Sequence, residues 1–140
     1  MKSFHVATKI AAKPEAIWAL LTDAPGWTSW NSTIEKVEGT ISPGATVKLF
    51  VKINPGKAFP VKVTVFDAPT RMVWSGGMPL GLFKGERTYT LEAKGDEVEF
   101  TMREDYTGLL AGLITKSIPD LQPAFDDFAR DLKTRAEKGS

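Results

Sequence analysis

The chain has 140 residues and no cysteine, and its 18 Lys and Arg against 17 Asp and Glu give a net charge of +1. The lack of cysteine excludes disulfide scaffolds, thiol catalysis and Cys-ligated metals, and the balanced charge argues against nucleic-acid binding. The length fits one domain over residues 1–140. No signal peptide is recognisable and no apolar run approaches the ~20 residues of a membrane span. We therefore expect a cytoplasmic protein without integral membrane association.

The chain opens with a strand pattern followed by two short helical ones. Apolar and polar residues alternate over Phe4–Ile10, which predicts a strand. Pro14 suits the first turn of a helix, which Ala24-Pro25-Gly26 would end. Trp27 and Trp30 lie three residues apart, so one short helical turn can bury both. We expect both rings to be structural.

The middle of the chain predicts an antiparallel sheet. Alternation over Val47–Ile53 is followed by a turn at Asn54-Pro55-Gly56. In the next run Val61, Val63 and Val65 would face one side, with Phe66 on the other, before a further strand around Met72–Trp74. Each run implies one buried and one solvated face.

Two apolar stretches contain glycine and interrupt this pattern, at residues 76–83 and 108–114. The first is too rich in Gly and Pro for a regular element. Such a loop either caps the core or closes a pocket, and the sequence leaves the choice open. As pocket gates, both segments would exchange their amide hydrogens fast and slow down when an apolar ligand binds.

Between these stretches, Glu86–Ala93 and Glu97–Tyr106 predict a hairpin with a two-residue turn at Gly95-Asp96. Opposed residue numbers then sum to 191. The same face of the hairpin pairs Leu91 with Phe100, Tyr89 with Met102, and Arg87 with Glu104. A shift of one residue would turn polar side chains toward the core. The register therefore places Arg87 and Glu104 on the inward face, as a planar guanidinium beside a carboxylate.

The C-terminal segment predicts an amphipathic helix of about 17 residues that can lie across a sheet. Asp120 is a suitable N-cap, and Pro123 is tolerated in a first turn. Its apolar positions follow helical spacing: Leu121, Phe125, Phe128, Leu132 and Ala136.

Motifs for nucleotide binding, metal-dependent hydrolysis and serine hydrolysis are absent from the sequence. The single histidine, His5, falls on the polar side of the first strand. We therefore expect no metal site and no cofactor, and no catalytic residue can be assigned from motifs.

Several short motifs occur in a familiar order: Ile10–Trp18, Leu21-Thr22-Asp23, Trp27-x-x-Trp30-Asn31, Val37-Glu38-Gly39, Val73-Trp74, Tyr106-x-Gly108 and Leu132–Glu137. Together they resemble the SRPBCC or START-like superfamily, in particular its polyketide cyclase/dehydrase-type branch. The resemblance covers essentially the whole chain.

This resemblance implies an α+β helix-grip fold. A curved antiparallel sheet of about seven strands would wrap around the long C-terminal helix, with two short helices after the first strand and a cavity between sheet and helix. Members bind lipids, hormones, polyketides or quinone-like molecules there, and some are enzymes. Two positions depart from the common pattern: Ser32 where Pro is frequent, and Arg87 where His is frequent. Because arginine cannot exchange a proton at neutral pH, the second departure counts against proton-transfer chemistry.

Two hypotheses for the function remain. The first is binding of a small hydrophobic molecule in the cavity, although its candidate residues could also simply fill a core. The second is a cyclase, dehydratase or hydrolase that uses Glu104, Tyr89 or Tyr106, with Arg87 stabilising charge. No nucleic-acid partner is expected, and a homodimer is left open. The candidate ligand contacts are Arg87, Glu104, Tyr89, Met102, Trp74, Met72, Phe100, Phe83, Leu110 and Phe125.

Overall fold

The computed structural model describes residues 2–53, 55–78, 80–117 and 120–138. The elements in chain order are β1 (Lys2–Ile10), α1 (Pro14–Thr22), η1 (Pro25–Ser29), β2 (Ile34–Glu38), β3 (Thr46–Val51), β4 (Ala58–Asp67), β5 (Arg71–Met78), β6 (Phe83–Lys94), β7 (Glu97–Thr107), α2 (Ala111–Ile114), η2 (Thr115–Ser117) and α3 (Gln122–Lys138). The turn predicted at Asn54 and the loop position Pro79 lie outside the described residues.

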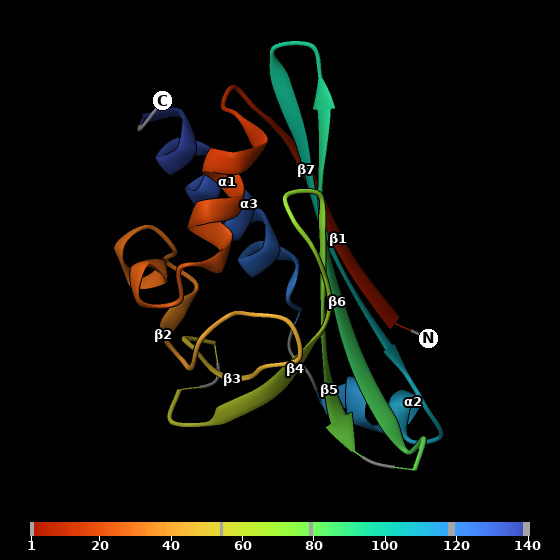
Figure 1. Ribbon diagram of the computed structural model, residues 1–140. Coiled ribbons are helices and arrows are strands. Elements are labelled where there is room, and N and C mark those ends of the chain that lie inside the picture. Colours follow the sequence, from red (N-terminus) through yellow and green to blue (C-terminus); the bar gives the residue numbers. More distant parts are fainter. Residues whose placement is uncertain (1, 54, 79, 118–119, 139–140) are drawn as a thin grey trace.

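The seven strands form one antiparallel sheet in the order β1-β7-β6-β5-β4-β3-β2. The sheet curls so that β2, β3 and β4 turn under the helices, while α1 and α3 pack together on the concave side (Figure 1). The short helix α2 lies at the other end, beside the hairpin that joins β5 to β6 (Figure 1). This architecture confirms the expected helix-grip fold.

The two short helices form where the sequence predicts them. Pro14 begins α1 and Pro25 begins the 3-10 helix η1. Trp27 in η1 is 1% exposed, and its indole Nε1 donates to the carbonyl of Leu21, 3.0 Å away. The Trp30 ring packs on Trp27 with 5.5 Å between centroids but stays partly exposed. The pair therefore closes one end of the core, with Trp27 as the fully buried member.

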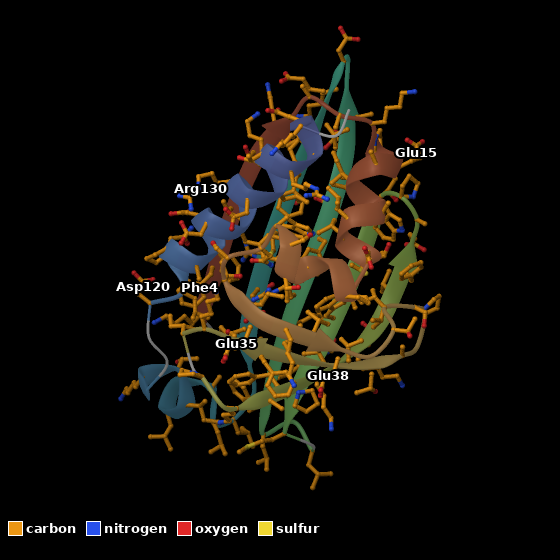
Figure 2. All side chains as sticks on the ribbon, turned by 90° about the vertical axis from the view of Figure 1, so that its left-hand side faces the viewer. Phe4, Glu15, Glu35, Glu38, Asp120 and Arg130 are labelled. Atoms are coloured by element: carbon orange, nitrogen blue, oxygen red, sulfur yellow. The ribbon has the colours of Figure 1, made fainter. Side chains whose placement is uncertain are left out.

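Helix α3 has the predicted 17 residues and covers the edge strand β1. Asp120 lies two residues before the helix, and its carboxylate accepts the N–H of Gln122. Gln122 and Lys133 donate to the carbonyls of His5 and Lys9 at 2.8 and 2.6 Å. These bonds use backbone groups that an uncovered edge strand would leave open to other chains. Figure 2 shows α3 beside α1 in front of the sheet, with Arg130 on its outer side.

Helix α3 is also tied to the segment before β2. The backbone N–H and the hydroxyl of Ser32 both donate to one carboxylate oxygen of Asp131, at 2.8 and 2.6 Å. Proline at position 32 would remove both donors. Serine at position 32, where the family often has proline, therefore makes a contact with α3 that proline could not make.

One strand differs from its predicted pattern. A bulge between Val63 and Val65 shifts the register of β4 against β5, so that Phe66 pairs with Met72. Phe66 therefore packs against the core and contacts Trp18 with 5.2 Å between ring centroids. The predicted outward position of Phe66 is wrong, because a β-bulge inverts the alternation beyond it.

The predicted loop at residues 76–83 is also mostly strand. Gly76, Gly77 and Met78 belong to β5 and pair with Gly85, Lys84 and Phe83 of β6. Glycine lowers strand propensity, but the ladder bonds use only the backbone. At the other end of the sheet, β3 stops at Val51, and Ile53, predicted to be strand, lies beyond it and is 45% exposed.

We predict that Trp27→Ala lowers the free energy of unfolding by about 3–5 kcal/mol, since truncating a buried aromatic residue leaves a cavity. Trp30→Ala should cost less, because that ring is partly exposed. Urea denaturation followed by circular dichroism measures both. Equal and small losses would show that the Trp27 stack does not stabilise the fold.

Candidate functional site

The hairpin of β6 and β7 has the predicted register, which confirms that Arg87 lies opposite Glu104. Arg87 Nε donates to Glu104 Oε1 at 2.8 Å, and the two side chains are only 18% and 15% exposed. On the same face, the register places Phe4 of β1 beside Glu104 and Trp74 of β5 beside Arg87. The pair thus sits in a row of otherwise apolar side chains.

Two further side chains complete this polar cluster. Tyr106 donates its hydroxyl to the second carboxylate oxygen of Glu104. The Phe125 ring, from the first turn of α3, lies under the Arg87 guanidinium at 4.9 Å. Figure 2 shows Phe4 near the start of α3, and its ring is 5.8 Å from that of Phe125. Both oxygens of Glu104 are therefore occupied, and the cation is covered by an aromatic face.

Burial and the neighbouring charges shift the pKa values of three groups in this cluster. Burial alone would lower the pKa of Arg87, but the Glu104 carboxylate and the Tyr89 hydroxyl together outweigh it and raise that pKa. Burial raises the pKa of Tyr89 to about 12, with Arg87 opposing the shift. Burial and the Glu104 charge together raise the pKa of Tyr106. At neutral pH, Arg87 is charged and both tyrosines are protonated, so this cluster offers hydrogen-bond donors rather than a base.

Some donors of the cluster have no acceptor. Within the described residues, the Tyr89 hydroxyl and Trp74 Nε1 are buried and make no hydrogen bond. Arg87 acts on the pKa of Tyr89 but does not bond it with ordinary geometry. Arg87 itself bonds Glu104 through Nε, and its guanidinium also faces the Tyr89 hydroxyl. Buried donors are normally paired. The Tyr89 hydroxyl and Trp74 Nε1 are therefore suited to an acceptor atom of a bound molecule.

The structure brings most of the ten predicted contact residues together, but in a packed core. The Trp74 ring lies between Trp27 and Tyr89, with centroids 5.4 and 5.1 Å away. Phe128 of α3, which the prediction omitted, contacts Tyr89 and Phe100. Phe83 and Leu110 are partly exposed at the opposite end. Six of the ten are at most 2% exposed, namely Met72, Trp74, Tyr89, Phe100, Met102 and Phe125.

Two glycines that the site prediction missed lie below Arg87 on the same face. Gly76 and Gly85 pair across β5 and β6. A Cβ at Gly85 would come within 3.2 Å of the Tyr106 ring, so glycine lets that ring lie against the strand. Tyr106 in turn stacks on Phe83, with 5.7 Å between centroids. At Gly76 a Cβ would meet the carbonyl oxygen of Pro60 at 2.8 Å, so this glycine also permits a close approach. A pair of inward-facing glycines was the available sequence signal for this close packing.

The two predicted gates contact each other. Leu109 and Leu110 donate their backbone N–H groups to the carbonyls of Gly81 and Leu82, at 3.1 and 2.7 Å. Gly108, with a φ of 113°, approaches Leu82 so closely that a Cβ would meet its carbonyl oxygen at 2.7 Å. The segments thus form one unit over the open end of the sheet. Their mobility stays a prediction.

Two shallow surface recesses lie elsewhere. One runs between the turn after β1 and the Gly95-Asp96 turn, and the other lies between η1 and Lys52. Neither is lined by any of the ten predicted residues. Among the described residues, no three His, Asp or Glu side chains gather in a way that could hold a metal ion. In the same part of the chain, no helix is long and apolar enough to cross a membrane.

Comparison with known proteins agrees with this architecture. Residues 1–137 match the family described as polyketide cyclase / dehydrase and lipid transport. The chain belongs to this family. No curated protein matches the sequence.

Solved structures share the fold at low identity. A START superfamily protein from Mycobacterium smegmatis has a TM-score of 0.71 at 18% identity, over 99% of each chain. DynU16, a putative protein of the dynemicin biosynthetic locus, has a TM-score of 0.73 at 17% identity, over 100% of this chain and 49% of that one. The Aha1 dimer from Colwellia psychrerythraea has a TM-score of 0.74 at 19% identity, over 100% and 99%. The family as a whole points to hydrophobic ligands or polyketide-related activity.

We predict strong non-additivity between Arg87 and Glu104. Arg87→Met or Glu104→Leu alone leaves a largely buried charge without its partner and should cost about 3–5 kcal/mol, while the double variant should be close to the wild type. Chemical denaturation of the four proteins gives the double-mutant cycle. Small additive losses would mean that water solvates the pair.

We predict that neither tyrosine of the native protein ionises below about pH 11, whereas unfolded tyrosine titrates near pH 10. The chain has two tyrosines, Tyr89 and Tyr106, so absorbance at 295 nm reports on both. Because the folded pKa of Tyr89 is raised, its contribution to stability is fully present below about pH 10 and is lost as the pH rises toward 12. Release of one tyrosinate near pH 10 in the folded protein would contradict the assigned burial.

Proposed function

We propose that the protein binds a small, mostly apolar molecule that carries an acceptor oxygen, such as a lipid, polyketide or quinone-like compound with a carbonyl or carboxylate. Its oxygen would lie beside Arg87 and Tyr89. The observation that carries this proposal is a pair of buried donors without acceptors, the Tyr89 hydroxyl and Trp74 Nε1, on the same face as the charged Arg87 guanidinium. An unsatisfied buried donor costs about 1–3 kcal/mol, which a bound acceptor would recover.

The apolar part of the ligand needs room, and the two halves of the concave face differ in this respect. The half around Trp74 is filled by aromatic rings. The half around Gly76 and Gly85 is covered by Pro60 and by the Tyr106 ring, and its other apolar side chains are only partly buried, so they can move aside at lower cost. We therefore place the apolar part along this second half. These side chains include Val61, which a Cβ at Gly76 would meet, and Phe83, which stacks on Tyr106.

Binding is favoured over catalysis by the state of the polar groups. Tyr106 already donates to Glu104, and Glu104 accepts from both Arg87 and Tyr106. Arg87 holds its proton at any physiological pH. A reaction that needs proton transfer would first have to take this network apart. Positioned donors that stay protonated are suited to holding an oxygen.

Native mass spectrometry of freshly purified protein tests the proposal directly. We expect a retained hydrophobic molecule with a carbonyl or carboxylate group. Conversion of that molecule by the protein would instead support the cyclase, dehydratase or hydrolase alternative. A protein that retains nothing, and shows no heat of binding with a long-chain fatty acid, would refute ligand binding at this site.

A matched pair of variants separates the ligand-facing hydroxyl from the structural one. Without ligand, Tyr106→Phe should lose about 1.5–3 kcal/mol, since its hydroxyl bonds a carboxylate, while Tyr89→Phe should lose nothing or gain up to about 1 kcal/mol. With a fatty acid as probe, Tyr89→Phe should weaken affinity roughly fivefold. Calorimetry and denaturation measure the two effects. Destabilisation by Tyr89→Phe without loss of affinity would overturn the assignment.

A further inference from the structure

Four large apolar side chains are exposed together at the end of the molecule that carries α2. Their exposed fractions are 49% for Met78, 91% for Leu80, 85% for Leu109 and 70% for Leu113. We name this set the leucine tip. It comes from the β5–β6 hairpin and from the segment that begins α2. Isolated exposed leucines are common, but a group of this size on one protruding end is not.

The leucine tip is one structural unit. The bonds from Leu109 and Leu110 to Gly81 and Leu82 join its two segments. Leu113 lies in α2, and Leu109 lies in the turn that leads into this helix. Figure 1 shows α2 directly beside the end of the hairpin.

Leu80 is in a conformation that leucine rarely adopts. Its φ is 61°, in the left-handed region, and its side chain is 91% exposed. This conformation costs about 1–2 kcal/mol for a residue with a Cβ, and glycine or asparagine would reduce the cost. Folding alone gives no reason for a leucine here. Strain of this kind is found where a side chain serves another purpose.

The charged residues that lie nearest to the tip in the chain are lysines. Within the described residues of 76–85 and 107–117, the charged side chains are Lys84 and Lys116, both exposed. Glu86 lies 3.1 Å from Lys84, but both partners are well exposed, so the pair is weak in water. Apolar side chains flanked by lysines complement a surface of anionic lipid headgroups.

We propose that the leucine tip inserts into the surface of a bilayer that contains anionic lipids. A stable protein–protein contact needs about 20–30 residues on each side. Four side chains on a protruding end are too few for that, but they suit shallow insertion among headgroups. This proposal goes beyond ligand binding and does not depend on it.

The test is co-sedimentation of the full chain with vesicles of phosphatidylcholine alone and of phosphatidylcholine with phosphatidylglycerol in equal parts. We expect binding to the anionic vesicles that weakens as salt is added. Leu80→Asn and Leu109→Ser should each reduce the partition coefficient, roughly tenfold per leucine. Leu80→Asn should keep or raise the melting temperature, since asparagine tolerates the left-handed region, and so its loss of binding cannot be ascribed to unfolding.

Two control variants accompany the vesicle-binding experiment. Ile53→Ser removes an exposed apolar side chain from the β3–β4 connection and should leave vesicle binding unchanged. Tyr89→Phe should also bind vesicles as the wild type does, so the failure of ligand binding and the failure of vesicle binding are told apart. Absence of binding to anionic vesicles would overturn the proposal. So would a wild-type dimer in gel filtration that Leu109→Ser converts to monomer, because the tip would then contact a second copy.

Discussion

The antiparallel pairing of β6 with β7 is the constraint on which the interior depends. The two-residue turn at Gly95-Asp96 sets the register, and the period of two then decides which side chains face α3. The same register that buries Tyr89 beside Met102 also turns Arg87 and Glu104 inward. A shift of one residue would expose the aromatic core, so the fold accepts the charged pair. Its desolvation is compensated by the hydrogen bond between the pair, by the Tyr106 hydroxyl and by the Phe125 ring.

The Arg87–Glu104 pair divides the concave face into two regions whose side chains are packed differently. On one side the rings of Trp27, Trp74, Tyr89 and Phe128 pack against each other, and a cavity there would cost the contacts that stabilise the fold. On the other side, Gly76 and Gly85 remove side chains from two paired strands. Pro60 and the Tyr106 ring lie against these glycines, and the apolar side chains around them are only partly buried. A ligand in the first region would have to separate fully buried rings, whereas in the second it would displace side chains that bury less area.

Much of the architecture was predictable from the sequence because it depends on local signals. Alternation predicted the strands, Pro14 and the spacing of Trp27 and Trp30 predicted the short helices, and the two-residue turn at Gly95-Asp96 placed Arg87 opposite Glu104. The position of Phe66 was not predictable, since the bulge after Val63 depends on how β4 pairs with β5. Nor does alternation distinguish a ring that fills a core from one that lines a cavity. Trp74 and Phe100 satisfy both descriptions, and only the packing of Trp27 and Phe128 against them shows that they fill the core.

The polar cluster and the leucine tip are joined by a short series of contacts. Phe83 follows the tip directly in the chain and stacks on Tyr106, and Tyr106 donates to Glu104, which holds Arg87. Gly85 keeps the Tyr106 ring against the strand, where a Cβ would displace it. A displacement of the hairpin end by a lipid surface would therefore move Phe83 first. Tyr106 would lose its stacking partner, and with it the packing that orients its hydroxyl toward Glu104. The leucine tip and the polar cluster are therefore coupled through the Phe83–Tyr106 stack, although they rest on separate proposals.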